Sequence, residues 1–228
     1  MIVQKYLAEK GICSRKEAEA FFRSGLILVN GQQALPGVDI LDTDVVTLAP
    51  EAVAQLAEKT TVAVYKPRGI VCSLGEGEGA RIQDAFPQYK ELSIVGRLDK
   101  ESEGLLLLTN DGLITKAVTG DTHTTEKEYE VTVRETLSPE TIAPFESGLT
   151  LSDGPTLPAT AALLSPHTFR IVIKEGRNRQ IRRMCGAINL TVQKLKRIRI
   201  GGIQLESMQP GDSRELTSEE VRSLKSSV

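Results

Sequence analysis

The sequence predicts an α+β fold in two parts: a small N-terminal αβ module, and a larger domain with a mainly antiparallel mixed sheet flanked by helices. Strand-like segments outnumber helical ones in the larger part, and short hairpin-like spacings separate many of them. The N-terminal part has its own helix and turn signals, and an Ala/Glu-rich connector follows it. We therefore predict a module over residues 1–48, a linker over 49–59 and a second domain over 60–228.

Two local motifs define the module. Ser14 and Glu17 have the Ser-x-x-Glu spacing of a capping box, which marks the start of a helix. Asn30 and Gly31 form a dipeptide typical of a tight hairpin turn. The expected elements are a helix ending at Gly11, a helix from Ser14 to Gly25, a strand over 26–29, further strand over 38–48 with a turn near Asp42 and Asp44, and a linker or short helical turn over 51–59.

The second domain opens with a strand and contains a strongly apolar centre. Residues 105–108 are consecutive leucines, a run typical of a buried strand. Ser138 and Pro139 fit the cap and the first position of a helix, whereas Asp111 and Gly112 fit a simple turn. The expected strands are 61–65, 94–95, 105–108, 129–134, 159–164 and 169–174, and the expected helices are 137–145, 180–188 and 216–224.

The composition is that of a soluble globular protein, with 228 residues of which 40% are hydrophobic and 25% charged. No apolar run has the length of a membrane-spanning helix, and the first residues lack a signal-peptide core. We therefore expect no membrane partner and a cytoplasmic location. Three scattered cysteines and two histidines without ligand spacing argue against disulfides and against a metal site.

The net charge of −2 does not suggest a nucleic-acid partner, but the distribution of charge does. Between residues 174 and 199 a single acid, Glu175, stands among nine basic residues. A solvated charged face is the simpler interpretation of such a run. Apolar residues interleave with these charges, however, which favours a packed element with a phosphate-facing side. The basic residues are Lys174, Arg177, Arg179, Arg182, Arg183, Lys194, Lys196, Arg197 and Arg199.

One loop already has the features of a site. Arg97 and Asp99 flank a leucine just after Gly96, and the leucine strand follows soon after. On this stretch alone, a structural Arg–Asp pair that fixes the loop is the preferred interpretation. A serine or cysteine triad is hard to build because neither histidine neighbours a plausible nucleophile. The glycine-rich residues 75–79 lack the lysine of a phosphate-binding loop, so we interpret them as a flexible surface loop and expect no nucleotide cofactor.

Four stretches of the sequence, taken in their order along the chain, resemble the motifs of a known enzyme family. They are Tyr-Lys-Pro-Arg-Gly at 65–69, the stretch 96–112 that begins with Gly-Arg-Leu-Asp, Glu-Lys-Glu-Tyr-Glu-Val at 126–131, and Glu-Gly-Arg-Asn-Arg-Gln-Ile-Arg-Arg-Met at 175–184. Together they resemble the bacterial ribosomal-RNA pseudouridine synthases of the RsuA/RluF type, over nearly the whole chain. The resemblance implies site-specific isomerisation of uridine to pseudouridine in ribosomal RNA or a ribosomal-subunit precursor. The last stretch looks closer to the RluF branch, which acts on large-subunit RNA.

The resemblance also implies residue roles. Asp99 would be the catalytic carboxylate, Tyr129 would stack against the flipped-out target base, and Arg182 would pair with Asp99. Arg97 would be a second partner of this carboxylate or would hold the RNA backbone. The remaining implied contacts are with substrate, from Lys66, Pro67, Ile181, Arg177, Gln180 and Arg183, and with phosphates, from Lys194, Lys196, Arg197 and Arg199.

The N-terminal module resembles the RNA-binding module named after ribosomal protein S4. This implies RNA contacts from Lys5, Arg15, Lys16 and Arg23. A generic αβ cap with surface lysines is the alternative, because the module carries six acids against five bases.

Pseudouridine formation breaks the N1–C1′ bond and rejoins the uracil through C5, so it needs no redox cofactor and no metal. The carboxylate either attacks C1′ or removes the C2′ proton, and the sequence does not separate these routes. Either route requires an ionised carboxylate, which a neighbouring guanidinium favours. The alternative functions are a non-catalytic RNA-binding or ribosome-assembly factor and a protein-interaction module with a basic face. We expect a monomer.

Overall fold

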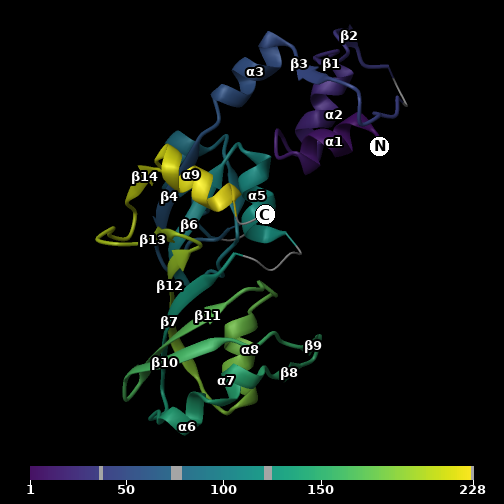
Figure 1. Cartoon of the computed structure of the whole chain (residues 1–228). Coiled ribbons are helices and arrows are strands. Elements are labelled where there is room, and N and C mark those ends of the chain that lie inside the picture. The colour runs from purple at the N-terminus through teal and green to yellow at the C-terminus, as the bar shows by residue number, and fades with distance from the viewer. Residues whose placement is uncertain (36–37, 73–78, 121–124, 227–228) are drawn as a thin grey trace.

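The computed structural model describes residues 1–35, 38–72, 79–120 and 125–226. The molecule is elongated, with the N-terminal module at one end and the larger domain extending away from it (Figure 1). One continuous sheet runs through the larger domain, and each half of it carries its own helices. Most of the glycine-rich segment 75–79, predicted as a surface loop, lies outside the described residues.

The module packs two helices and a three-stranded sheet around one apolar core. The predicted capping box is confirmed: the Ser14 Oγ accepts from the Glu17 N–H at 3.3 Å, and the Ser14 N–H donates to the Glu17 carboxylate at 2.8 Å. Asn30 and Gly31 have φ values of 52° and 79°, as the predicted hairpin requires. The bounds are α1 Val3–Glu9, α2 Arg15–Arg23, β1 Ile27–Val29, β2 Gln32–Gln33 and β3 Val46–Leu48.

The predicted strand over 38–48 is wrong except at its end, where β3 lies. Ahead of β3 the chain forms the turn predicted near Asp42 and Asp44, in which the Asp44 carboxylate accepts from the Leu41 N–H and from the Asn30 side-chain amide, both at 2.8 Å. Local bonds of this kind give the backbone an alternative to strand pairing.

We predict that Ser14→Ala destabilises the N-terminal module by about 1 kcal/mol, because the first turn of α2 loses its side-chain acceptor. Hydrogen–deuterium exchange of the α2 amides measures this, since exchange should quicken in the module and not in the larger domain. Ser24→Ala, at the other end of the same helix, is the control. Equal exchange in the two variants would contradict the prediction.

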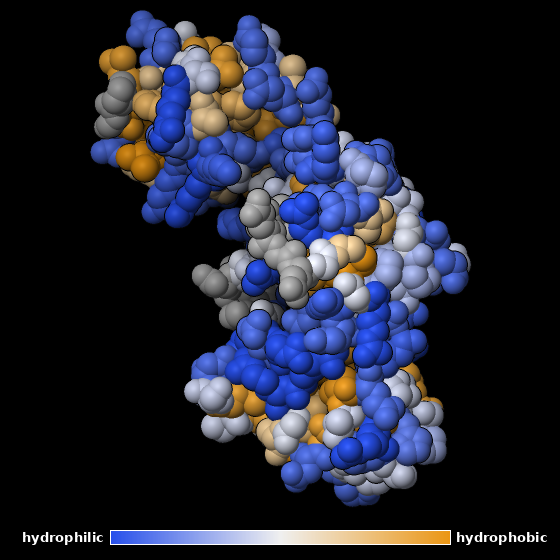
Figure 2. Space-filling view, turned by 180° about the vertical axis from the view of Figure 1, so that it is seen from behind, coloured by the Kyte–Doolittle hydropathy of each residue, from blue (hydrophilic) through white to orange (hydrophobic). Residues whose placement is uncertain are grey.

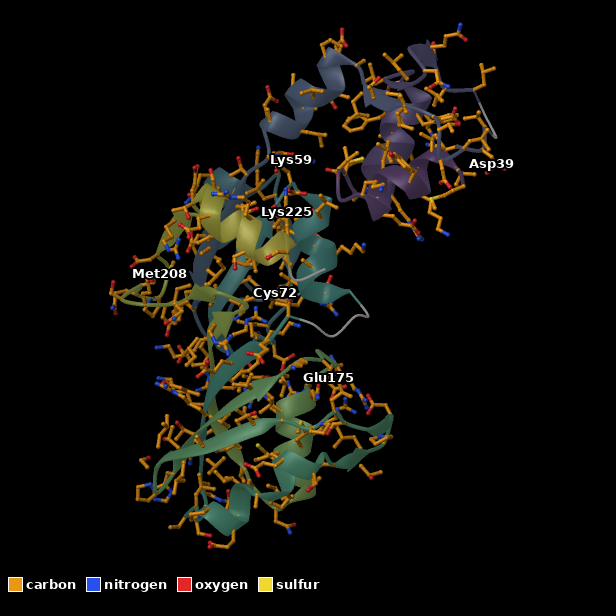
Figure 3. The ribbon with its side chains drawn as sticks, viewed as in Figure 1. Asp39, Lys59, Cys72, Glu175, Met208 and Lys225 are labelled. Carbon is orange, nitrogen blue, oxygen red and sulfur yellow. The ribbon has the colours of Figure 1, made fainter. Side chains whose placement is uncertain are left out.

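The connector folds as a helix, α3 (Pro50–Ala57), and Lys59 just beyond it ties the module to the larger domain (Figure 3). The Lys59 ammonium donates to the Glu17 carboxylate and, at 2.9 Å, to the Asn110 carbonyl. A Cβ on Gly112 would lie 2.4 Å from the Ser14 Oγ, so the two parts approach closely there. Because Glu17 serves both the cap and this ion pair, the folding of α2 is linked to the docking of the module.

A nine-stranded sheet organises the larger domain and confirms the predicted mainly antiparallel, mixed arrangement. The order is β10-β11-β7-β12-β6-β4-β14, with β13 on β12 and β5 on β6. Among the described pairs only β12 with β6 is parallel, at Lys196–Glu103 and Arg197–Gly104. The bounds are β4 Thr61–Lys66, β5 Ser93–Val95, β6 Glu103–Thr109, β7 Lys127–Val133, β10 Thr160–Ser165, β11 Thr168–Ile173, β12 Val192–Ile200, β13 Ile203–Gln204 and β14 Ser213–Glu215, with a separate hairpin of β8 Thr150–Leu151 and β9 Gly154–Pro155.

Two apolar clusters hold the helices on the sheet. One runs through both halves and includes Phe86, Leu106 and Phe145, and the other packs Leu107 against Ile114 beneath the last helix. The helices are α4 Ile82–Ala85, α5 Gly112–Thr119, α6 Pro139–Ile142, α7 Pro144–Ser147, α8 Gln180–Ala187 and α9 Ser218–Lys225, with a 3₁₀ turn at Pro87–Tyr89. None of the helices in this described part is long and apolar enough to cross a bilayer.

Three elements differ from their predictions. The longest strand, β12, lies where the sequence indicates only a packed basic segment. Helix α5 begins where a simple turn is predicted, because the Asp111 carboxylate accepts from the Leu113 N–H at 2.9 Å and caps it. The predicted helix over 137–145 is divided into α6 and α7 at Pro144, which has no N–H to continue it.

Candidate active site

A cleft of about 900 Å³ opens where the two halves of the sheet meet. Its walls come from the loop 96–102, from β7, from the end of α5 and from residues 173–181. Cys72 and Glu175, which both line it, lie on opposite sides in Figure 3. Figure 2 shows hydrophilic residues dominating the middle of the molecule, whereas hydrophobic ones gather on the N-terminal module and at the far end.

Asp99 lies in this cleft beside two guanidinium groups. Its side chain is 27% exposed, and its Oδ2 lies 3.6 Å from the Arg179 Nη1 and 3.8 Å from the Arg182 Nε. Its carbonyl accepts from the Ser102 N–H at 3.0 Å, which closes the loop. The arrangement is an accessible carboxylate held among fixed positive charges, and it can act as a nucleophile or a base.

Arg182 reaches the cleft from α8 and is mostly buried, with 13% of its side chain exposed. Its Nη2 lies 3.3 Å from the Ser102 Oγ and 3.4 Å from the Glu101 carbonyl. Its Nε is buried without a hydrogen-bond partner among the described residues, and faces Asp99. Burial lowers the pKa of the Arg182 guanidinium, and the nearby Arg179 lowers it further, but an arginine still remains charged.

Arg179 is the site residue that the sequence analysis did not single out. It precedes α8 in a left-handed conformation, with φ 47° and ψ 32°, which directs it back towards the loop of Asp99. Its guanidinium donates to the Glu101 carboxylate at 2.9 Å. Arg97 is exposed in the cleft and forms no ion pair with Asp99 in the described structure. The second cation beside Asp99 is therefore Arg179 rather than Arg97.

Tyr129 lies in the cleft wall on β7 and is only 7% exposed. Lys127, two residues earlier on the same side of the strand, also lines the cleft and donates to the Thr125 carbonyl at 3.2 Å. Burial, with a contribution from Arg197, lowers the pKa of the Lys127 ammonium to about 8. Lys127 is a cleft cation that the sequence analysis did not identify.

Lys66 is fully buried beneath the Asp99 loop. Its ammonium donates to the Ser102 carbonyl at 2.7 Å and to the Pro67 carbonyl at 2.9 Å, and burial lowers its pKa. These bonds join the first motif to the second. Lys66 therefore supports the loop from below, and lies too deep to contact an RNA phosphate.

The floor of the cleft is a hydrogen-bonded network at the start of α8. The buried Glu175 carboxylate accepts from the Arg177 Nε at 3.0 Å and from the Gln180 amide. Ile181 is buried and lines the cleft next to this network. Arg183 forms a bidentate pair with Asp153 at 2.8 and 2.9 Å and does not line the cleft.

Of the phosphate contacts predicted on β12, the one at Arg197 is wrong, and those at Lys194, Lys196 and Arg199 stay predictions. Arg197 is 1% exposed, so it lies in the interior and offers no surface to a phosphate. Lys194 and Lys196 alternate with cleft-lining residues, so their side chains point to the opposite side of the strand. Lys194 pairs with Glu103 at 3.1 Å, and Arg199 pairs with Glu128 at 2.7 Å and with Glu126 at 3.1 Å.

In the module, two of the predicted RNA-binding residues are available to a ligand. Arg15 and Lys16 are exposed at the start of α2, and neither forms an ion pair within the part of the chain that the structure describes. Lys5 pairs with Glu9 at 3.6 Å, and Arg23 pairs with Glu19 at 3.1 Å. Exposed pairs of this kind are weak and exchange readily for a phosphate.

Residues 60–187, more than half of the chain, match the family of RNA pseudouridylate synthases. The chain belongs to this family. An S4 domain matches residues 3–46. A crystal structure of a pseudouridylate synthase superposes with a TM-score of 0.71 and 30% identity, over 97% of this chain and 98% of that one.

Relatives within the pseudouridylate synthase family span nearly the whole chain. The Dual-specificity RNA pseudouridine synthase RluF of Salmonella typhi is 37% identical, over 96% of this chain and 76% of its own length. The Ribosomal large subunit pseudouridine synthase B of Bacillus subtilis is 34% identical, over 98% of this chain and 95% of its own. The chain is thus an RNA pseudouridine synthase of the RluF and RluB type with an S4 module, and RNA is its substrate class.

Proposed function

We propose that this pseudouridine synthase modifies particular uridines of ribosomal RNA, and that Asp99 is its catalytic carboxylate. The observation that carries the proposal is the placement of Asp99: a partly exposed carboxylate in a 900 Å³ cleft, between the guanidinium groups of Arg179 and Arg182. A relative named for the large ribosomal subunit supports the choice of RNA. The S4 module supplies a second surface with which to hold it.

The reaction is an isomerisation in which atoms and charge balance. The N1–C1′ bond breaks and a C5–C1′ bond forms, while N1 gains a proton and C5 loses one. The Asp99 carboxylate either bonds to C1′ until C5 returns, or removes the C2′ proton and later gives it back. On both routes the Arg182 guanidinium, whose Nε lies 3.8 Å from the Asp99 Oδ2, orients the carboxylate.

Tyr129 would stack on the uracil once it has left the RNA helix, and this recovers part of the few kcal/mol that flipping costs. We predict that Tyr129→Leu lowers kcat/KM by roughly 10- to 100-fold, because base–aromatic stacking is worth about 1–3 kcal/mol. Tyr129→Phe keeps the ring and should bind RNA like the wild type. Steady-state kinetics on a ribosomal RNA fragment compare the two, and equal kcat/KM for Leu and Phe would exclude a stacking role.

The exposed cations at the start of α2 would hold RNA phosphates. We predict that the double variant Arg15→Glu/Lys16→Glu weakens RNA binding and reduces the slope of log K against log salt by about 2, as expected for two lost phosphate contacts. The rate at saturating RNA should not change, because the cleft is untouched. An unchanged affinity and salt slope would place the RNA away from this face of the module.

Mapping pseudouridine in total RNA from cells with and without the gene tests the proposed function. Carbodiimide treatment followed by reverse transcription detects each pseudouridine as a stop. We expect one or more ribosomal-RNA stops to disappear with the gene and to return with the wild type but not with Asp99→Asn. No change in ribosomal RNA would refute the choice of substrate, and a return of the stops with Asp99→Asn would refute the role of the carboxylate.

A further inference from the structure

The most unusual side chain outside the contacts described for Asp99 is Arg197. It is the largest fully buried side chain in the described structure, although arginine is almost never buried unless it is paired. No carboxylate lies within ion-pair distance of it among the described residues. Burying an unpaired charge costs stability, so a position that retains one calls for an explanation.

Neutral oxygens from three elements satisfy the Arg197 guanidinium instead. The Nε donates to the Leu105 carbonyl of β6 at 2.7 Å, and the Nη2 donates to the Gly96 carbonyl at 2.6 Å. The Nη1 lies 3.5 Å from the Tyr129 hydroxyl, and the guanidinium carbon lies 5.9 Å from the centre of the Tyr129 ring. One planar group therefore contacts the turn before Asp99, the strand after it, and the tyrosine of the cleft.

Arg197 lies close to β6, to β7 and to the turn at Gly96. Arg197 pairs with Tyr129 on one side and with Gly104 on the other, where β12 runs parallel to β6. A Cβ on Gly104 would lie 2.2 Å from the Arg197 carbonyl, so only glycine permits this approach. Gly96 has a φ of +65°, and a Cβ there would lie 3.6 Å from the Arg197 Nη1. The Arg197 guanidinium thus lies against Gly96, before Asp99, and the Arg197 backbone lies against Gly104, after it.

We infer that Arg197 is a positioning residue that sets the distance and angle between the Tyr129 ring and the Asp99 loop. This inference rests on the proposed function, in which a flipped uracil occupies the space between the two. Because the guanidinium donates to the phenol oxygen, it also directs the hydroxyl hydrogen of Tyr129 away from itself. A guanidinium holds its five donors in a rigid plane and so fixes the directions of its bonds to three elements, whereas the donors of a lysine ammonium rotate about a single nitrogen.

Two variants of Arg197 and one control test this role. Arg197→Met fills a similar volume without donors, and Arg197→Lys keeps the charge with a less directional donor. Arg214→Met is the control, because Arg214 donates two hydrogen bonds to Glu220, at 2.8 and 2.9 Å, from another strand of the same sheet and does not line the cleft. The measurements are single-turnover rate, RNA affinity, and NMR of ¹³C-labelled tyrosine rings, with the Tyr129 signal assigned by its loss in Tyr129→Phe.

We expect Arg197→Met to lower the single-turnover rate by about 100-fold, the effect of a misplacement of about 1 Å, with little change in RNA affinity. The Tyr129 signal should shift, while Arg214→Met leaves both the rate and this signal unchanged. Adding Tyr129→Phe to Arg197→Lys should lower the rate by less than the product of the two single effects.

A normal rate or an unmoved Tyr129 signal in folded Arg197→Met would overturn the inference. So would a loss of RNA affinity with a reduced salt slope, which would indicate a phosphate contact. If Arg197→Met does not fold, the same three measurements on Arg197→Lys (the rate, the Tyr129 signal and the RNA affinity) test the inference. The NMR signal of Tyr129 can be measured without turnover, so it tests the role of Arg197 independently of the reaction. If the wild type modifies no ribosomal RNA, that result would refute the proposed function and leave the test of Arg197 intact.

Discussion

Asp99→Asn is expected to abolish pseudouridine formation, with a fall in kcat of at least about 1000-fold, because an amide neither forms the bond to C1′ nor takes a proton from C2′. The asparagine has the same shape, so the loop that Ser102 closes should keep its conformation. The side chain of Asp99 is partly exposed, and ion pairs at such positions contribute little to stability. Thermal unfolding and RNA binding should therefore stay close to the wild type.

A tritium-release or mapping assay on ribosomal RNA measures this effect. Asp212→Asn is the matched control, since its carboxylate accepts from the Gln209 N–H in a turn that does not line the cleft. Full activity of the control with none in Asp99→Asn would assign the chemistry to one carboxylate. Substantial activity in Asp99→Asn would make Asp99 a structural partner of its two arginines.

Arg182→Leu is expected to lower kcat by about 100- to 1000-fold, because Asp99, the proposed catalytic carboxylate, loses a preorganised charge that orients it. The same change should leave thermal stability unchanged or higher. The Arg182 Nε is buried without an acceptor, and an unsatisfied buried donor costs about 1–3 kcal/mol that leucine would not incur. Activity and stability thus move in opposite directions in this variant.

Arg182→Lys separates charge from geometry. The lysine keeps a cation near Asp99 but cannot reach Ser102 and Glu101 with separate donors, so we expect only part of the rate to return. Kinetics and thermal unfolding on the same preparations provide the comparison. Loss of stability in Arg182→Leu that matches its loss of activity would indicate a purely structural role.

The sequence predicts much of this fold where the local signals agree with the tertiary structure. The capping box at Ser14, the Asn30 turn and the leucine strand all form as predicted, because each depends on neighbours in the sequence. β12 was not predicted because its lysines and arginines hide the alternation of its apolar residues. Helix α5 was not predicted because aspartate is favoured both in turns and at helix N-caps, so Asp111 does not distinguish the two.

The site is less predictable than the fold because it depends on contacts between distant segments. Arg179 approaches Asp99 only through a left-handed backbone conformation, for which its side chain gives no local signal. A charge count likewise groups Arg197 with its exposed neighbours on β12. Only the register of β12 between β6 and β7 reveals that Arg197 points inward whereas Lys196 points outward.

The place of β12 in the sheet also determines at what point of its synthesis the chain can first form the cleft. β6 and β7 follow one another along the chain, yet β12, completed only at Ile200, lies between them. Until that residue has been made, both strands present open edges, and the tyrosine and the carboxylate have nothing to hold them in register. A nascent chain therefore emerges beside ribosomal RNA without a working cleft, and acquires one only when its last long strand closes the gap.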